Sequence, residues 1–253
     1  METIHRSPVA VVIPTYNETE TISIFLRELS SHMSGKDLIV IADDSDPRFR
    51  DKFIAICQNS IENQKVKLLF TFSDSKSGRG LAVRRAMELI QSLEYEIEYV
   101  VECDADSSHR VDDVVALVRN NSLSDVLIGS RYLSTSAIIG WPRSRRTFSL
   151  ILNLLIPKIL KIDITDATNG LRRYNKHAVR KLLMFEIKNT GFIYLSEQLL
   201  ILARNGCSIS EMPIVFINRT IGSSSVTWRD VRSSLIGLFH LALNKKSFDL
   251  SVK

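Results

Sequence analysis

Short apolar, β-branched runs alternate with segments of helical spacing along the first half of the chain, and this alternation limits the possible folds more than any other feature. The runs cover residues 9–13, 38–42, 66–70, 99–101 and 126–128. The helical segments between them cover residues 20–33, 48–63, 80–93 and 112–120. Continuous apolar runs are typical of strands buried on both faces. The pattern therefore predicts an α/β fold with a central, mainly parallel sheet flanked by helices.

The alternation lapses near residue 131, and two amphipathic helical patterns follow over residues 148–162 and 228–243. Arginine and lysine residues flank both patterns. No internal repeat, low-complexity tract or Gly/Ser linker marks a second independent domain. We therefore expect one domain over residues 1–253, with a first part over 8–130 and a more specialised second part over 131–245.

Composition and charge narrow the class of protein. The chain has 253 residues, of which 45% are hydrophobic and 24% charged, so it is globular and not disordered, collagen-like or coiled-coil. The formal charge of +5 is scattered among acidic neighbours and does not predict nucleic-acid binding. Three cysteines without a C-x-x-C pair favour a reducing compartment over a disulfide framework or a thiolate zinc site.

Membrane-spanning and secretory segments are not predicted. A spanning helix needs about 20 mostly apolar residues, and the longest apolar stretches are shorter than this. The first fifteen residues lack the cleavage pattern of a secretory signal. We expect the protein to stay in the cytoplasm.

Polar residues follow four of the predicted strands. In parallel sheets with flanking helices, ligands bind beyond the carboxyl ends of the strands, so these residues are the candidates for function. They are Pro14-Thr-Tyr-Asn-Glu18, Asp43-Asp-Ser-Asp46, the segment 73–80, and Asp104-Ala-Asp106.

Asp104 and Asp106, separated by Ala105, are the strongest local signal. Two carboxylates at a strand end can share a divalent cation whose other ligands are phosphate oxygens and water. The alternative is a turn with two acids that cap the following helix. The strand before the pair favours the metal site. We expect the neighbouring Cys103 to face the other way and to be a small buried hydrophobic residue.

The other strand ends can bind a nucleotide. Tyr16 can cover a base, and Glu18, Asp43 and Asp44 can accept hydrogen bonds from ribose or base groups, although capping and a solvated turn are the simpler alternatives. No G-x-G-x-x-G motif opens the first helix, so a Rossmann cofactor loop is not indicated. The turn around Arg79, between Gly78 and Gly80, suits a diphosphate through backbone N–H groups and the guanidinium group.

With these residues in view, the chain resembles the family 2 inverting glycosyltransferases, and within them the dolichyl-phosphate mannose synthase group, over residues 8–240. The four strand-end segments match the family's motifs in order. Further matches downstream are Gly129-Ser-Arg-Tyr132, Gly140-Trp141 with Arg145 and Arg146, Asp166-x-Thr168-x-Gly170-Leu-Arg172, Gly191-Phe192 with Glu197, and Met212-Pro-Ile214 leading to Arg219-x-x-Gly222. Two positions depart from the family pattern: Ser108 stands where a Gln is usual, and Ser225 where a Lys is usual.

The resemblance implies a nucleotide-sugar-binding glycosyltransferase A-type fold and transfer of mannose or glucose from a donor of the GDP-mannose or UDP-glucose type to a polyprenyl or dolichyl phosphate. It implies Mg²⁺ or Mn²⁺ as the cofactor, held by Asp104 and Asp106. The nucleotide sugar would bind to Pro14, Tyr16, Glu18, Asp43, Asp44, Arg79, Asp104 and Ala105. Asp106, Arg131 and Glu197 would be catalytic, and Arg145, Arg146, Arg172 and Arg219 would bind acceptor or donor phosphates.

A lipid acceptor further implies contact with a membrane. The two basic amphipathic segments would lie at the cytoplasmic face, directly or through a membrane-spanning partner protein, although packing within the domain is the commoner fate of such helices. Three alternatives stay open at this point. They are a sugar or protein hydroxyl acceptor, a catalytically silent nucleotide-sugar-binding subunit motivated by Ser108 and Ser225, and a nucleotidyltransferase, whose Gly-rich loop the first strand end lacks.

Overall fold

Seven strands form the central sheet, in the order β3-β2-β1-β4-β7-β5-β8. The computed structural model describes residues 7–187, 189, 193–218 and 228–249. The strands are β1 (Val9–Thr15), β2 (Leu38–Asp43), β3 (Lys67–Phe72), β4 (Tyr99–Glu102), β5 (Val126–Ser130), β7 (Arg172–Asn175) and β8 (Ile209–Pro213). All neighbours are parallel except β7, which runs antiparallel to both β4 and β5. The predicted mainly parallel α/β sheet is therefore confirmed.

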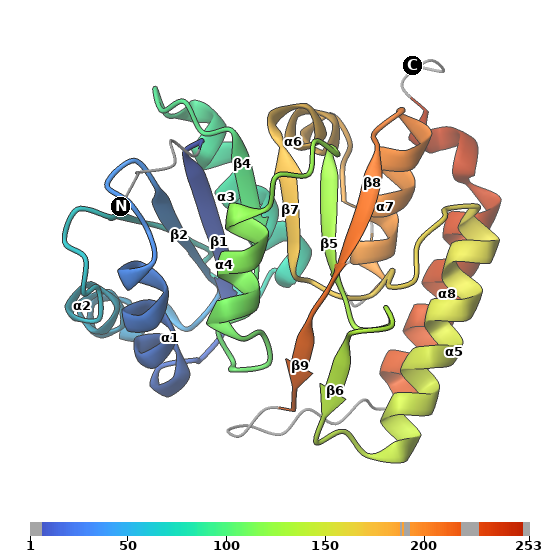
Figure 1. Cartoon of the computed structure of the whole chain (residues 1–253), viewed down its shortest axis with the longest axis horizontal. Helices are drawn as coiled ribbons and strands as arrows, with labels where there is room; N and C mark the ends of the chain where they lie inside the picture. The colour runs from blue at the N-terminus through green and yellow to red at the C-terminus, as the bar shows by residue number, and fades with distance from the viewer. Residues whose placement is uncertain (1–6, 188, 190–192, 219–227, 250–253) are drawn as a thin grey trace.

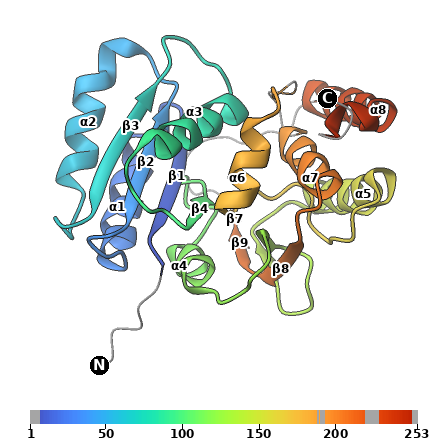
Figure 2. The ribbon, with the colours of Figure 1, turned by 90° about the horizontal axis from the view of Figure 1, so that it is seen from above.

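Helices cover both faces of the sheet (Figures 1 and 2). They are α1 (Glu20–Ser31), α2 (Arg50–Asn59), α3 (Arg79–Ser92), α4 (Val111–Arg119), α5 (Arg143–Leu160), α6 (Lys176–Leu183), α7 (Tyr194–Arg204) and α8 (Trp228–Leu243). Two single-turn 3₁₀ helices, Pro47–Phe49 and Lys245–Phe248, complete the helical structure that the described residues show.

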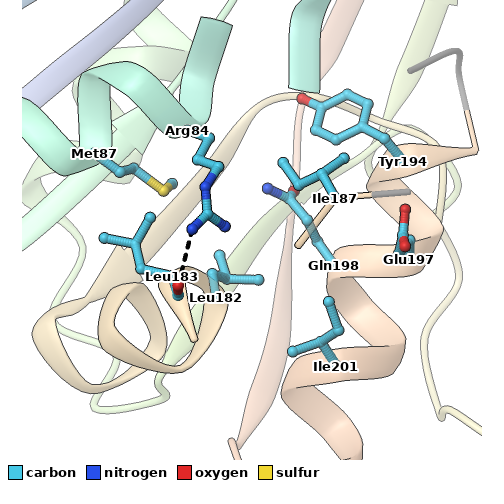
Figure 3. Close-up of a pocket in the computed structure, with 9 residues that line it drawn as sticks. All are labelled: Arg84, Met87, Leu182, Leu183, Ile187, Tyr194, Glu197, Gln198 and Ile201. Carbon is cyan, nitrogen blue, oxygen red and sulfur yellow. Dashed lines mark hydrogen bonds between the residues drawn. The ribbon is translucent and has the colours of Figure 1, made fainter. Parts of the chain in front are cut away.

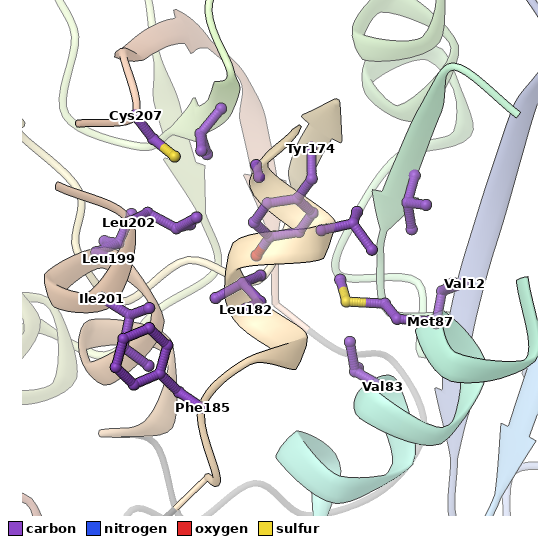
Figure 4. Close-up of a cluster of buried hydrophobic side chains, with 14 of the residues drawn as sticks. Val12, Val83, Met87, Tyr174, Leu182, Phe185, Leu199, Ile201, Leu202 and Cys207 are labelled. Carbon is purple, nitrogen blue, oxygen red and sulfur yellow. The ribbon is translucent and has the colours of Figure 1, made fainter. Parts of the chain in front are cut away.

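Alternation along the strands produces two hydrophobic cores. On β1, Ala10 and Val12 point into the core formed with α3, α5, α6, α7 and α8, part of which Figure 4 shows. Val11 and Ile13 point to the opposite face, into the core formed with α1, α2 and α4. Successive strand residues face opposite sides of a sheet, so a strand covered on both sides must be apolar at every position. The apolar runs of the sequence follow from this arrangement.

Two features of the sheet differ from the prediction. The third strand starts at Lys67 and its residues are only partly buried, because β3 is an edge strand and is covered on fewer sides than its neighbours. The strand β7 escaped prediction because Arg172 and Arg173 interrupt its apolar pattern, yet both side chains are buried. The two arginines are typical of a surface segment, although the strand that carries them lies inside the sheet between β4 and β5.

A second, two-stranded sheet joins β6 (Ala137–Ile139) and β9 (Val215–Ile217), which run parallel beside the lower ends of the central strands in Figure 1. Beyond β8, α5 and α8 lie side by side. Both amphipathic patterns are thus helices, and α5 continues through Pro157 to Leu160. Among the helices the structure describes, none has the length and apolar character needed to cross a membrane.

Candidate functional site

The carboxyl ends of β1, β2 and β4 lie next to one another because these strands are parallel neighbours. Thr15 pairs with Asp43 across β1 and β2, and Val12 pairs with Glu102 across β1 and β4. The loops that leave these strands therefore meet at one edge of the sheet. This edge holds the polar segments that the sequence singles out, as the fold class predicts.

The loop after β1 presents an aromatic ring at this edge. The Tyr16 side chain is exposed, and the ammonium group of Lys76, from the loop before α3, lies 4.0 Å from its ring centroid. Asn17 has a left-handed backbone with φ of 58° and donates its backbone N–H to the Ser45 hydroxyl at 2.7 Å. Pro14 and Glu18 are half-buried beside it. The first loop is thus connected to the loops after β2 and before α3.

The two acids after β2 are both buried and fasten neighbouring loops. Asp43 accepts hydrogen bonds from the hydroxyls of Thr15 and Ser45, at 2.8 and 2.6 Å. Asp44 accepts the backbone N–H groups of Ser77 and Gly78, at 2.8 and 2.9 Å, and forms an ion pair with Arg85. Asp44 therefore uses the N–H groups that the sequence assigns to a diphosphate.

Arg79 lies between two carboxylates. Its Nε donates to Glu102 at 2.9 Å and to the hydroxyl of Tyr194 at 2.9 Å, while its Nη1 forms an ion pair with Asp104. Burial opposes the charged form, but Tyr194 and Glu102 outweigh this effect and raise the pKa of Arg79. The predicted phosphate-binding cation is therefore a fixed positive charge that holds acids at the end of β4.

The loop that carries Asp104 and Asp106 is held by its own residues. Ser107 has a left-handed backbone with φ of 66°, which turns the chain so that the backbone N–H of Ser108 donates to Asp106 at 3.0 Å. His109 accepts the backbone N–H of Asp104 on its Nδ1 at 2.9 Å. Backbone strain of this kind is maintained only where the surroundings determine the loop. The two carboxylates are consequently preorganised.

His109 is a neutral support for this loop. Its side chain is buried, and burial lowers its pKa to about 4, against the opposing effect of a hydrogen bond with Asn169. Since Nδ1 accepts from Asp104, the proton is assigned to Nε2, which lies 3.1 Å from the side-chain oxygen of Asn169. The sequence analysis did not identify His109, Asn169, Glu102 or Tyr194. A period-two pattern of acids, Glu-x-Asp-x-Asp from residue 102, is the signal that reveals Glu102.

As predicted, Cys103 is buried, and burial raises the pKa of its thiol. The small Ala105 between the two acids is buried as well. Both residues pack in the same hydrophobic core as Val101. The acids therefore project from a loop whose other side chains are anchored in the core.

Arg131 is a buried, paired arginine. Its Nε and Nη2 donate to the two carboxylate oxygens of Asp166 at 2.7 and 2.8 Å, and Nη2 also donates to Thr168 at 2.7 Å. Its guanidinium carbon lies 5.3 Å from the ring centroids of both Trp141 and Phe216. Arg131 and the motif beginning at Asp166 thus form one unit.

Arg145 is more accessible than Arg131. Its guanidinium carbon lies 4.1 Å from the ring centroid of Trp141, and its Nη1 donates to the side chain of Asn218 at 3.1 Å. Asn218 follows β9, which is also linked to the loop of the acids because the N–H of Ile217 donates to the carbonyl of Ser108. Arg146 is exposed. The small sheet therefore connects the first turn of α5 with the end of β4.

Arg172 differs from its predicted role as a phosphate ligand. Its guanidinium group is fully buried and donates to three backbone carbonyls, those of Asn169, Leu195 and Ala167, at 2.7 to 2.9 Å. Arg172 lies opposite Glu102 at the end of β4, but its guanidinium group braces the segment that carries Asp166 in place of the predicted phosphate contact.

Glu197 is also placed differently from expectation. It is buried on α7, where its Oε2 accepts the backbone and side-chain N–H groups of Asn189, at 3.0 and 2.9 Å. Figure 3 shows it beside a cavity of about 10 Å³ with Arg84, Gln198 and Tyr194, and Asp104 and Asp106 are not among the lining residues. A cavity of this size holds about one water molecule, so it cannot accept a sugar. Arg219, Gly191, Phe192, Gly222 and Ser225 lie outside the described residues.

The end of β4 supplies some of the oxygen ligands that a hard divalent cation needs. Within the described ranges, no group of three or more His, Cys, Asp or Glu side chains could hold a metal by itself. Mg²⁺ and Mn²⁺ suit oxygen ligands, and Mg²⁺ is commonly held by one or two carboxylates together with substrate phosphates and water. Asp104, whose side chain is 22% exposed, and Asp106 fit that shared type of site.

A largely parallel sheet with acids clustered at the ends of β1, β2 and β4 is typical of α/β proteins that bind a ligand at the carboxyl ends of the strands. More particularly, the chain belongs to glycosyl transferase family 2, whose family model matches residues 10–183. The protein is therefore a glycosyltransferase. The resemblance read from the motifs is confirmed at the level of the family.

Two curated relatives are similar over almost the whole chain. The undecaprenyl-phosphate mannosyltransferase of Micrococcus luteus is 29% identical over 231 residues, covering 91% of this chain and 92% of that protein. The polyprenol monophosphomannose synthase of Mycolicibacterium smegmatis is 26% identical over 226 residues, covering 89% and 83%.

Solved structures share the fold. Glucosyl-3-phosphoglycerate synthase from Mycobacterium tuberculosis, in complex with Mn²⁺, UDP and phosphoglyceric acid, has a TM-score of 0.63 at 14% identity, covering 94% of this chain and 79% of its own. Mannosyltransferase PcManGT from Pyrobaculum calidifontis, in complex with GDP-Man and Mn²⁺, has a TM-score of 0.62 at 16% identity, covering 95% and 65%. The predicted glycosyltransferase A-type fold is thus confirmed.

Proposed function

We propose that this protein transfers a mannosyl group from GDP-mannose to a polyprenyl phosphate, with Mg²⁺ or Mn²⁺ as the cofactor. The observation that carries the proposal is the similarity to two curated enzymes, an undecaprenyl-phosphate mannosyltransferase and a polyprenol monophosphomannose synthase, over about nine-tenths of the chain. GDP-mannose and Mn²⁺ together occupy a structural neighbour, which supports the donor and the cation.

The reaction forms one bond and breaks one bond. A phosphate oxygen of the acceptor bonds to the anomeric carbon of mannose, and the bond from that carbon to the donor diphosphate breaks, so that its electron pair leaves with GDP. A divalent cation held by Asp104 and Asp106 supplies Lewis-acid stabilisation of the charge that develops on the diphosphate. A phosphate acceptor is already ionised at neutral pH, and no catalytic base is required. Glu197 is buried and lines a cavity that Asp104 and Asp106 do not line, which agrees with this point.

The remaining residues divide between donor and acceptor. We assign Tyr16, Glu18 and Asp43 to the nucleotide, because they lie at the carboxyl ends of β1 and β2. We assign Arg145 and Arg146, on the first turn of α5, to the acceptor phosphate, with Arg131 behind them as a fixed positive charge. Arginine is suited to this task because its planar group binds phosphate through two hydrogen bonds.

The apolar face of α5 favours a lipid acceptor over a hydroxyl acceptor. Leu150, Ile151, Leu154 and Leu155 are 42 to 53% exposed along this helix, and Ile236, Phe239 and Leu243 are exposed on α8. A groove of about 610 Å³ beside α5 adds Lys158 and Lys161 to this surface. Apolar side chains bordered by lysines are typical of helices that lie at a membrane surface. We therefore propose peripheral attachment to the cytoplasmic face of a membrane, directly or through a membrane-spanning partner.

A donor and acceptor panel tests the function. The purified protein is incubated with GDP-mannose or UDP-glucose, each radiolabelled in the sugar and each supplied with Mg²⁺ or Mn²⁺, and with either a short polyprenyl phosphate or the corresponding polyprenol. We expect label in the lipid phase only with GDP-mannose and polyprenyl phosphate. Transfer to the polyprenol in place of its phosphate would replace the proposal with a hydroxyl acceptor. Absence of transfer from every donor would support a silent binding subunit.

Flotation tests the membrane contact. We expect the protein to float with vesicles that contain anionic lipids and to be released at high salt, because salt screens the attraction between the basic residues and the lipid charge. Recovery of all the protein away from the vesicles at low salt would contradict direct attachment. Addition of a detergent-solubilised membrane fraction then tests attachment through a partner.

A further inference from the structure

Glu102 is a buried acid two residues before Asp104, and the proposed reaction gives it no role so far. Its side chain is fully buried at the last position of β4. One carboxylate oxygen accepts from Nε of Arg79 at 2.9 Å and from the hydroxyl of Tyr194, and the other lies 3.3 Å from the hydroxyl of Tyr174. An ionised carboxylate is expensive to bury without partners, so this position requires a cation beside it.

That cation is Arg79, which also contacts a proposed metal ligand. Its Nε donates to Glu102, whereas Nη1 pairs with Asp104. Because different nitrogen atoms make the two contacts, the guanidinium group can keep the first bond while it gives up the second. Asp104 is the more accessible of the two acids, with 22% of its side chain exposed against 0% for Glu102.

The acids at the end of β4 outnumber the arginine that pairs with them. Glu102, Asp104 and Asp106 carry three negative charges, and Arg79 supplies one positive charge between Glu102 and Asp104. Arg172, whose backbone pairs with that of Glu102, donates to backbone carbonyls, and Arg131 pairs with Asp166. The acids therefore attract a cation, and the strength of this attraction depends on whether Arg79 stays paired with Glu102.

We propose that Glu102 is a positioning residue that retains Arg79 while Asp104 exchanges its ion pair with Arg79 for a bond to the divalent cation. In the cation-free protein Arg79 is shared between Glu102 and Asp104, and in the cation-bound protein it pairs with Glu102 alone. This inference rests on the metal-dependent transferase proposed above and adds to it a built-in counter-ion that competes with the metal.

The surroundings of Arg79 support a fixed position for its side chain. Gly170 lies so close that a Cβ atom there would come within 2.4 Å of Nη2 of Arg79, and a Cβ atom at Gly80 would come within 2.9 Å of the Tyr194 ring. A Cβ atom at Gly80 would crowd the aromatic ring, and one at Gly170 would displace the guanidinium group, so glycine at these positions leaves room for the cluster. Two glycines of the sequence motifs are thus explained by the Arg79–Glu102–Tyr194 cluster. The cluster also links the metal site to the first residue of α7.

Binding of Mn²⁺ to the whole chain, with and without GDP, tests the exchange through the electron paramagnetic resonance signal of free Mn²⁺. For Glu102→Gln we expect Mn²⁺ affinity to fall about tenfold, the scale found when a partner of a metal ligand is removed, because Arg79 then pairs with Asp104 alone. For the double variant Glu102→Gln/Arg79→Gln we expect affinity to return to within about threefold of the wild type, because the two substitutions remove one negative and one positive charge and so restore the net charge of the wild type.

Tyr194→Phe is the matched control, because it removes a hydrogen bond from the same cluster without changing the charge. We expect its Mn²⁺ affinity to match the wild type, and the thermal unfolding temperature of each variant reports its folding. Arg79→Gln provides an independent test if Glu102→Gln does not fold. We expect it to bind Mn²⁺ at least as tightly as the wild type, since the competing cation is gone.

Three results would overturn the inference. They are unchanged affinity in Glu102→Gln, no recovery in the double variant, and a tenfold loss in Arg79→Gln. Asp104→Asn and Asp106→Asn distinguish this failure from failure of the proposed function. If these two variants lose Mn²⁺ and Glu102→Gln does not, only the exchange is wrong. If they bind Mn²⁺ like the wild type, the metal site itself is wrong.

Discussion

The ends of β2 and β4 each carry a pair of acids, but the protein uses the two pairs differently. At the end of β2, Asp44 holds Ser77, Gly78 and Arg85 and so fastens the loop before α3. At the end of β4, Asp104 shares the guanidinium group of Arg79 with Glu102. An acid that has an arginine to itself, as Asp44 has Arg85, is part of the structural framework. An acid that shares its arginine, as Asp104 shares Arg79, keeps negative charge that can bind a cation. Substitutions should therefore separate stability at β2 from activity at β4.

The largest effect is expected at β4. Asp104→Asn and Asp106→Asn should each lower the rate of sugar transfer by about 10²–10³-fold, because a neutral amide weakens the hold on the cation that stabilises the leaving diphosphate. At position 106 asparagine keeps an oxygen that accepts from Ser108, and at position 104 Arg79 keeps its other partner, Glu102, so the thermal unfolding temperature should change little. Transfer assays with excess Mg²⁺ or Mn²⁺ and thermal melts measure the two effects. Full activity of both variants would remove the distinction between the strand ends.

Part of this arrangement is readable from the sequence. The apolar runs predict the strands, and their polar ends predict where the acids gather, because both follow from burial and from the parallel order of β1, β2 and β4. The sequence does not predict that the two pairs of acids have different roles, because these roles depend on the ion pairs that Arg79 and Arg85 form in the folded protein. These arginines lie six residues apart on α3, and each pairs with a different strand end.

The other features that the sequence does not predict involve charged residues that are buried. Arg172 and Arg173 are arginines in a central strand, where backbone carbonyls satisfy their guanidinium groups. The local sequence pattern predicts that such residues lie at the surface. The carbonyls that accept their hydrogen bonds lie in other segments and cannot be identified from the pattern. The sequence likewise predicts a catalytic role for Glu197, because its contact with Asn189 is visible only in the three-dimensional structure.

The second prediction concerns pH, and it applies to β4 alone because His109 supports that loop. Burial lowers the pKa of His109 to about 4, so between this value and 6.5 the unfolded chain binds a proton that the folded chain does not. The stabilisation by neutral His109 is complete above pH 6.5 and is lost as the pH falls through this window, by on the order of 3 kcal/mol.

Urea unfolding at pH 7.5 and 4.5 measures this dependence. The wild type and His109→Asn share every other titrating group, so the difference between their pH profiles isolates the histidine. We expect the wild type to lose more stability on acidification than His109→Asn does. Parallel profiles would show that His109 is protonated in the folded protein and that the loop of the acids is held in another way.

The third prediction tests the framework role of Asp44 at the end of β2. Asp44→Asn should lower the free energy of unfolding by about 2 kcal/mol, because it leaves Arg85 without its charged partner and weakens the bonds to Ser77 and Gly78. We expect the rate of transfer at saturating donor to stay within about threefold of the wild type once the folded fraction is taken into account. A large loss of rate in fully folded protein would make Asp44 part of the active site.

The smallest effects come from removing one hydroxyl at each strand end. Ser77→Ala takes a donor from Asp44 and an acceptor from Arg85, and Ser108→Ala takes a donor from Asp106, so each variant removes a hydroxyl that supports one acid. We expect each to cost about 1 kcal/mol, but in different measurements.

Ser77→Ala should lower the midpoint of urea unfolding and leave transfer unchanged, because the backbone N–H groups still fix the loop. Ser108→Ala should reduce transfer several-fold at limiting Mn²⁺, because Asp106 is then less well oriented, and excess Mn²⁺ should restore the rate. If both variants change stability alone, Asp106 is as much a framework residue as Asp44, and the contrast between β2 and β4 is wrong.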